Sequence, residues 1–266
     1  MEDSGINQRR VATERQGKVL VITVDNAPVN ALSSAVRQEL LQAIEAAEAD
    51  AGCEAVVLHG AGKHFSGGAD VREFGKAGLL PTLPDLCARI EALSKPVIAA
   101  IHGVCLGGGF ELALSAHYRV AAEDARIGLP EVLLGLLPGA GGTQRTTRLG
   151  GARIALDLAL SGRQAGAREL SQHGLIDMVV ASKNIVGAPV AFAVELARQG
   201  IRPRRAREAT SGLADIQANR GAVEQARADA EKKFRGLLSP FQIIEAVEVA
   251  LEKPFDEGMA VERGYF

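Results

Sequence analysis

Residues 97–111, Val-Ile-Ala-Ala-Ile-His-Gly-Val-Cys-Leu-Gly-Gly-Gly-Phe-Glu, predict a buried strand, a glycine-rich turn and the start of a helix. Pro96 opens the apolar run Val97–Ile101, which is typical of a strand inside a parallel sheet. The glycines at 107–109 have no Cβ, so a ligand can approach the backbone closely there. A strand that leads through such a turn into a helix indicates an α/β fold.

Strands and helices alternate along the first two-thirds of the chain. Apolar residues at helical spacing predict a helix after residue 33, capped by Ser33 or Ser34. Short apolar runs predict strands at residues 19–24, 55–58, 97–101, 118–121, 126–128 and 177–180. Charged helices dominate after about Pro203. We therefore expect a largely parallel α/β core over residues 1–200 and a helical C-terminal appendage over residues 201–266.

Composition excludes several classes of protein. Of the 266 residues 47% are hydrophobic, and an aromatic content of 4% without Trp offers few platforms for stacking nucleic-acid bases. A net charge of -2 gives no general attraction to nucleic acid or anionic membranes, and no apolar run is long enough to predict a membrane span. The first ten residues lack the apolar run of a secretory signal. Three widely spaced cysteines and five histidines without ligand spacing predict reduced thiols, a cytoplasmic location and no metal site.

A second glycine-rich turn, residues 65–73, has the same order of strand, turn and helix. The spacing of Asp70 and Glu73 fits a capping box, which predicts Ala69 at the entrance of a helix with unpaired backbone N–H groups. If the two turns are adjacent, each can aim one N–H at a single carbonyl oxygen and form an oxyanion hole. Tight packing turns are the plain alternative. Nucleotide binding is disfavoured, because neither turn reads GxGxxG or is followed by Gly-Lys-Ser/Thr.

Two carboxylates lie beside these turns. Glu111 follows the glycine turn at residues 107–109, and Glu131 stands among Leu129, Pro130 and Val132 with no nearby Lys or Arg. Two carboxylates in one apolar pocket do not both ionise easily, so one pKa is raised toward neutrality, as general acid–base catalysis requires. Alternatively, Glu111 only interacts with a helix dipole. A third glycine turn, at residues 136–145, offers backbone N–H groups for a water or a ligand oxygen.

These motifs, in this order and spacing, resemble the enoyl-CoA hydratase/isomerase (crotonase) family. The likeness runs from about Val11 almost to the end of the chain and rests on residues 66–71, 95–103, 106–113, 128–131 and 139–145. It implies a spiral of ββα units with a helical C-terminal region. It also implies that the N–H groups of Ala69 and Gly108 hold a thioester oxygen, while Glu111 takes a proton from the attacking water and Glu131 delivers one to C2.

The resemblance carries further expectations about ligands. The substrate is an acyl-CoA thioester of fatty-acid β-oxidation or related catabolism, with no cofactor besides the coenzyme A of the substrate. The chain is expected to form a homo-oligomer, a trimer or a dimer of trimers, without nucleic-acid or membrane partners. Substrate contacts are implied for seven further positions: Ala31, Gly68, Asp70, Val71, Gly107, Pro130 and Gly139.

Within the family, the chain is most similar to the hydratase part of multifunctional β-oxidation enzymes. Residues 71–76, 117–119 and 254–263 carry this likeness. No dehydrogenase part follows Phe266, so we expect a C-terminal region shortened relative to the family. Two other functions stay open: a Δ3-Δ2-enoyl-CoA isomerase that uses mainly Glu131 in the same site, and a non-catalytic or RNA-binding family member.

Overall fold

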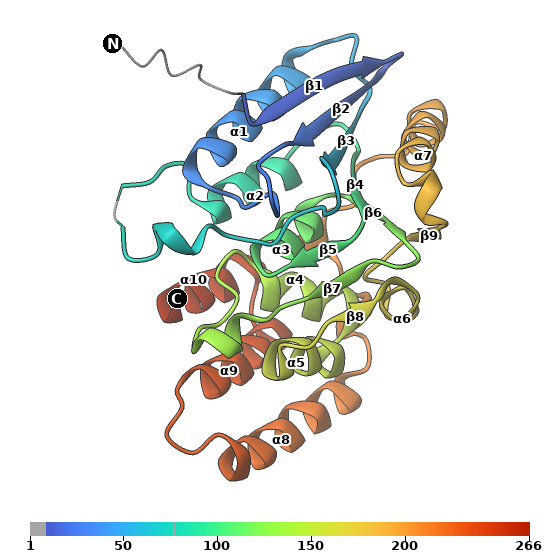
Figure 1. Ribbon diagram of the computed structural model, residues 1–266. Coiled ribbons are helices and arrows are strands. Elements are labelled where there is room, and N and C mark those ends of the chain that lie inside the picture. Colours follow the sequence, from blue (N-terminus) through green and yellow to red (C-terminus); the bar gives the residue numbers. More distant parts are fainter. Residues whose placement is uncertain (1–8, 77) are drawn as a thin grey trace, which may run out of the picture.

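A six-stranded sheet forms the upper part of the molecule in Figure 1. The computed structural model describes residues 9–76 and 78–266. The prediction that the first ten residues are not a secretory signal falls mostly on residues 1–8, which lie outside the described residues. The strands are, in order across the sheet, β1 (Val11–Gln16), β2 (Val19–Val24), β3 (Ala55–Gly60), β4 (Val97–Ile101), β6 (Tyr118–Ala122) and β9 (Met178–Val180). Apart from the antiparallel β1–β2 hairpin, all neighbours are parallel. The predicted strand at residues 19–24 and the predicted parallel core are confirmed.

A second, three-stranded sheet carries the predicted turn residues. It consists of β5 (Val104–Leu106), β7 (Arg126–Gly128) and β8 (Ala165–Gly166), with β5–β7 parallel and β7–β8 antiparallel. The chain leaves β4 in the large sheet, enters β5 in the small sheet and then forms α3 (Gly108–Ser115). This repeat of two strands and a helix is the predicted ββα unit.

The helices of the first half cover the large sheet. Helix α1 (Ser34–Ala49) begins at the N-cap Ser33, whose hydroxyl accepts a hydrogen bond from the Val36 amide, and buries the predicted face with Leu40 and Ile44. Helix α2 (Leu83–Glu91) begins directly after its N-cap Thr82. Figure 1 shows α1 and α7 (Gly187–Arg198) on opposite sides of the sheet.

The remaining helices belong to the second half of the chain. They are α4 (Gly142–Gly150), α5 (Ala152–Ser161), α6 (Ala167–Gln172), α8 (Ile216–Lys233), α9 (Ser239–Glu252) and α10 (Phe255–Tyr265). Helices α9 and α10 pack on α4, and α5, α8 and α9 enclose a second apolar cluster around Leu156, Val223 and Val247. In the described part of the chain no helix is long and apolar enough to cross a bilayer. The predicted division after residue 200 stays a prediction.

Gly103, between β4 and β5, provides a test of this arrangement. It has a φ of +54°, and a Cβ there would overlap the Lys63 carbonyl oxygen. Gly62 has a similar φ of +70° with open space around it. We expect Gly103→Ala to lower the free energy of unfolding by about 1–3 kcal/mol more than Gly62→Ala, since only the first adds a steric clash to the backbone strain. Urea denaturation measures both; equal losses would contradict the role assigned to Gly103.

Candidate active site

The two glycine-rich turns lie side by side because their strands pair. The Phe65 amide donates to the His102 carbonyl at 2.9 Å, the Ser66 amide to the Val104 carbonyl at 3.2 Å, and the Leu106 amide returns to the Ser66 carbonyl at 3.1 Å. This short parallel pairing, centred on Ser66 and Cys105, joins the segment that follows β3 to β5. It brings the turn at residues 65–73 against the turn at residues 103–109.

The amides of Ala69 and Gly108 meet at this junction. A Cβ built on Gly108 would lie 3.1 Å from the Ala69 nitrogen, and one built on Gly68 would lie 3.3 Å from the Gly108 nitrogen. Neither amide donates to an acceptor within the described residues. Gly107, at φ +51°, precedes α3, so Gly108 stands at the positive end of the helix. The geometry suits one oxygen shared by both N–H groups, although their role toward a ligand stays a prediction.

A cavity of about 390 Å³ opens at these amides. Of the predicted site residues it is lined by Gly68, Ala69, Asp70, Val71, Gly107, Gly108, Glu111, Pro130, Glu131 and Gly139. Ala31 does not line it: its carbonyl accepts from the Asn26 side chain at 2.7 Å, and the amide of the next residue, Leu32, donates to the Gly68 carbonyl. Ala31 thus lies behind the turn at residues 65–73 and supports it.

Glu111 is buried in α3 and points toward the third glycine turn. Its Oε1 accepts from the amides of Ala140 at 2.7 Å and Gly142 at 2.9 Å. Burial raises the pKa of Glu111, and the two amides and the Arg145 guanidinium oppose that rise. The sequence predicted that the third turn offers its amides to a water or a ligand oxygen. The structure differs, because the amides of Ala140 and Gly142 already donate to the Glu111 carboxylate.

Glu131 faces the same cavity with fewer partners. It opens the 3₁₀ turn Glu131–Leu134, and its Oε2 is buried without a hydrogen-bond donor among the described residues. Burial raises the pKa of Glu131 well above its usual range, and the negative charge of Glu111 raises it further. A Cβ on Gly107 would come within 2.9 Å of Oε1, so that glycine makes room for the carboxyl group. The pocket thus holds two buried carboxyl groups: Glu111, which accepts from two main-chain amides, and Glu131, whose Oε2 has no donor among the described residues.

The sequence analysis missed a third buried carboxyl, Glu262 of α10. It accepts from the amides of Gly141 at 2.6 Å and Thr143 at 3.0 Å, and it contacts the Thr143 hydroxyl. Burial and the charge of Glu111 raise the pKa of Glu262 to about 8. Its spacing from the buried Phe255 and Gly258 places it on the inner face of α10, which is the signal that the sequence offered.

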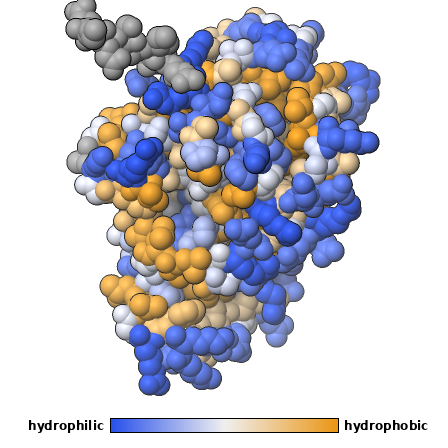
Figure 2. All heavy atoms as spheres, in the orientation of Figure 1, coloured by the Kyte–Doolittle hydropathy of each residue, from blue (hydrophilic) through white to orange (hydrophobic). Residues whose placement is uncertain are grey.

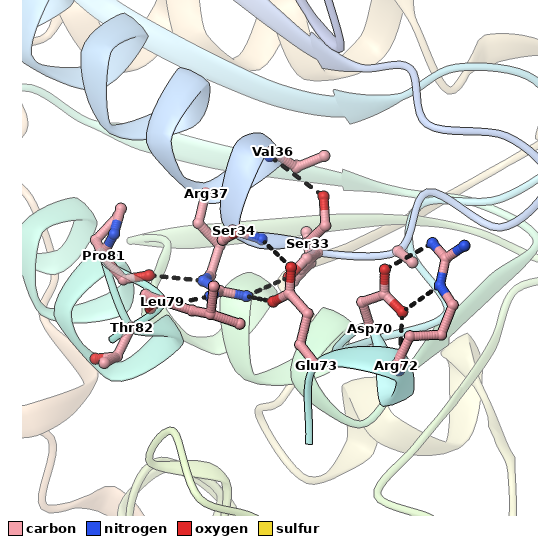
Figure 3. Close-up of polar contacts among 12 residues, drawn as sticks. Ser33, Ser34, Val36, Arg37, Asp70, Arg72, Glu73, Leu79, Pro81 and Thr82 are labelled. Atoms are coloured by element: carbon pink, nitrogen blue, oxygen red, sulfur yellow. Dashed lines mark hydrogen bonds and ion pairs between the residues drawn. The ribbon is translucent and has the colours of Figure 1, made fainter. Parts of the chain in front are cut away.

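The predicted capping box at Asp70 and Glu73 is wrong. Val71–Glu73 is only a single 3₁₀ turn, and Asp70 caps it by accepting from the Arg72 amide. Glu73 instead accepts from the Ser34 amide at 2.8 Å and from Arg37 at 2.9 Å, as Figure 3 shows. Arg37 also donates to the carbonyls of Leu32, Leu79 and Pro81. A long-range ion pair thus anchors the cavity wall to α1.

No group of three or more His, Cys, Asp or Glu side chains within the described residues is arranged to hold a metal ion. The expectations of no metal and no separate cofactor stay predictions.

Glu262 makes stability depend on pH. Because its pKa is raised to about 8 from an ordinary 4.5, the folded chain binds this proton more tightly than the unfolded chain, and the stabilisation is lost as pH rises through 8. We expect the free energy of unfolding to fall between about pH 5 and 8, by on the order of 1 kcal/mol per pH unit, and Glu262→Gln to flatten this fall. Denaturant titrations across pH measure the slope, with exposed Glu257→Gln as control. Equal slopes in wild type and Glu262→Gln would refute the assignment.

Comparisons with known proteins agree with the geometry. The sequence model of the family "Enoyl-CoA hydratase/isomerase" matches residues 14–235. The chain is 44% identical over 245 residues to the "Peroxisomal bifunctional enzyme" of Danio rerio, covering 91% of this chain and 33% of that one. It is 41% identical over 189 residues to the "2,3-dehydroadipyl-CoA hydratase" of Escherichia coli, covering 69% and 74%. The chain spans about a third of the length of the bifunctional relatives that it matches.

Solved structures show the same fold. An enoyl-CoA hydratase subunit of Geobacillus kaustophilus superposes with a TM-score of 0.68 at 33% identity, covering 97% of this chain and 88% of that one. The enoyl-CoA hydratase of Bacillus anthracis gives 0.68 at 29% identity, covering 87% and 99%. The predicted spiral of ββα units with a helical C-terminal region is confirmed. The chain belongs to the enoyl-CoA hydratase/isomerase family and has the crotonase fold.

Proposed function

We propose that the chain is an enoyl-CoA hydratase that adds water to trans-2-enoyl-CoA thioesters. The observation that carries this proposal is one cavity with two unpaired amides and two buried carboxyl groups, those of Glu111 and Glu131. The names of hydratase relatives support the same reaction, and the bifunctional relatives support a place in fatty-acid β-oxidation.

The thioester oxygen is the group that the two amides suit. When water attacks C3, negative charge develops on this oxygen as an enolate forms. The N–H groups of Ala69 and Gly108 are already oriented and unpaired, so they stabilise that charge without reorganisation. Apolar side chains rim the same cavity (Val71, Phe74, Leu134 and Phe266), and Figure 2 shows apolar atoms gathered on this face. An acyl chain fits such surroundings.

The hydrogen bonds assign the two proton-transfer roles. Glu111 accepts two main-chain N–H groups and lies near Arg145, which favours its ionised form as the base that takes a proton from water. Glu131 has an Oε2 without a donor and faces the charge of Glu111, so it holds its proton and delivers it to C2. Hydration needs both groups. A double-bond shift needs mainly one, so the pair favours hydration over the isomerase alternative, and nothing observed favours RNA binding.

Several expectations join this proposal without a test of their own. They are the homo-oligomer (a trimer or a dimer of trimers), the cytoplasmic location and the substrate contacts predicted from the family. Relatives include enzymes named peroxisomal, so the location is open to direct measurement.

Removing either carboxylate tests the mechanism. We expect Glu111→Gln and Glu131→Gln each to lower kcat for hydration of 2-enoyl-CoA by about 10²–10⁴-fold with little change in KM, since each group acts in proton transfer and not in ground-state binding. Loss of the enoyl thioester absorbance measures turnover, and exposed Glu224→Gln on α8 is the control. Full activity of Glu131→Gln would refute the proposed role.

The oxyanion donor is tested at Gly108, the first residue of α3, where a helix tolerates proline. Gly108→Ala adds a Cβ that presses on Leu83 but keeps the N–H. Gly108→Pro adds the same Cβ, removes the N–H and places the ring Cδ where the amide hydrogen pointed. We expect kcat of the proline variant to be about 10²–10³-fold below that of the alanine variant, as for other lost oxyanion donors. Equal kcat values for the two variants would show that this amide does not serve the reaction.

A further inference from the structure

Four successive amides of the third glycine turn alternate between two carboxylates. Those of Ala140 and Gly142 donate to Glu111, while those of Gly141 and Thr143 donate to Glu262. Glu111 belongs to α3 and faces the cavity; Glu262 belongs to α10, 151 residues later in the chain, and is fully buried. The same short segment therefore joins the proposed base to the C-terminal helix.

This segment has little freedom to move for one carboxylate alone. Gly141 has a φ of +97°, in the left-handed region. Arg145 donates to the Ala140 carbonyl at 2.8 Å and is itself held by a buried ion pair with Glu91 at 2.9 Å. With its carbonyl side held by Arg145 and its amides divided between two acceptors, the segment moves as a unit. A shift of Glu262 is thereby transmitted to the amides that orient Glu111.

Close packing fixes α10 against α4 and the cavity. A Cβ on Gly258 would overlap the buried side chain of Gln144, so α10 approaches α4 more closely than a larger residue allows. Phe255 lies beneath the Arg145 guanidinium, 5.1 Å from its ring centroid. At the other end of α10, Phe266 packs on Gly139 and edge-on against Phe74 in the cavity wall. The contacts that hold α10 against α4 therefore also shape the cavity.

We propose that Glu262 is a positioning residue for the catalytic base, holding the segment of residues 140–143 so that Glu111 stays aligned only while α10 is docked. This inference rests on the proposed function, in which Glu111 is the base. Glu262 does not line the cavity; it acts through the amides of Gly141 and Thr143, which alternate along the segment with those that donate to Glu111.

The chemistry of the site requires a carboxyl group at this position. Three donors converge on Glu262: two amides and the Thr143 hydroxyl. When ionised, the two carboxylate oxygens accept from all three; when protonated, they still accept from both amides while the O–H donates to the Thr143 hydroxyl. A glutamine has one oxygen, and its NH₂ group would face a donor. The charged groups around Glu262 are Glu111 on α3, Glu131 on the 3₁₀ turn and Arg145 on α4, so the two catalytic carboxyls sense its charge.

The first test is Glu262→Gln in the full chain. We expect kcat for 2-enoyl-CoA hydration to fall about 10–100-fold, because small misplacements of a catalytic group cost this much, while KM stays within about threefold. Glu257→Gln, the same chemical change on the exposed side of α10, should leave both constants unchanged. A kcat of Glu262→Gln equal to that of the wild type would overturn the proposal.

A double-mutant cycle with Glu111→Gln separates positioning from general damage. If Glu262 acts through Glu111, Glu262→Gln lowers kcat only when Glu111 is present, and the double variant equals Glu111→Gln alone. A further 10–100-fold loss in the double variant would show a structural effect and sink the idea. Should Glu262→Gln not fold, Thr143→Val, which removes one donor to Glu262, takes its place, with an expected three- to tenfold loss of kcat that must also vanish in the Glu111→Gln background.

Failure of the proposed function can be distinguished from failure of the inference about Glu262. If the wild-type chain hydrates no 2-enoyl thioester, that function is lost, and positioning is read from a crystal structure of Glu262→Gln. A Glu111 carboxylate still within hydrogen-bond distance of the Ala140 and Gly142 amides would then overturn the inference.

Discussion

The short parallel pairing between Ser66 and Cys105 is the constraint on which the site depends. It uses the amides of Phe65, Ser66 and Leu106 and stops at the glycines on both sides. Beyond it the two backbones still run close together, but the amides of Ala69 and Gly108 meet no carbonyl in the described part of the chain. A ligand oxygen placed between them completes the pairing. The site is therefore an unfinished end of a sheet, which costs little to build once the strands are paired.

The electrostatics of the site follow from an unequal supply of donors. Burial raises the pKa values of Glu111, Glu131 and Glu262 alike. Main-chain amides return part of the lost solvation to Glu111 and Glu262, and none of the turn's amides reaches Glu131. Since solvation of the charged form decides which acid ionises first, the placement of four amides is enough to give two neighbouring glutamates different proton affinities.

Features that rest on local pattern could be predicted from the sequence. The strand at 19–24, the helix capped by Ser33 and the exceptional position of Glu131 among apolar neighbours all express short-range rules. Strand β8 has only two residues, which is too short to show a period. The capping box failed because Arg37, 36 residues away, competes for Glu73. Glu262 stayed hidden among the charged residues of the tail, where only three-dimensional packing shows which carboxylate turns inward.

The same reasoning bears on the helical C-terminal region. A boundary near residue 200 separates two sequence patterns. In the structure, however, the first turn of α4 donates hydrogen bonds both to Glu111, before this boundary, and to Glu262, after it. Buried hydrogen bonds to a carboxylate are stronger than neutral ones, so an α10 displaced from α4 would leave donors and a carboxyl unsatisfied. That penalty favours the docked helix and the observed position of Glu111 together. The C-terminal helix thus contributes to the position of Glu111. Phe266, directly after this helix, also lines the cavity together with residues of the first half of the chain.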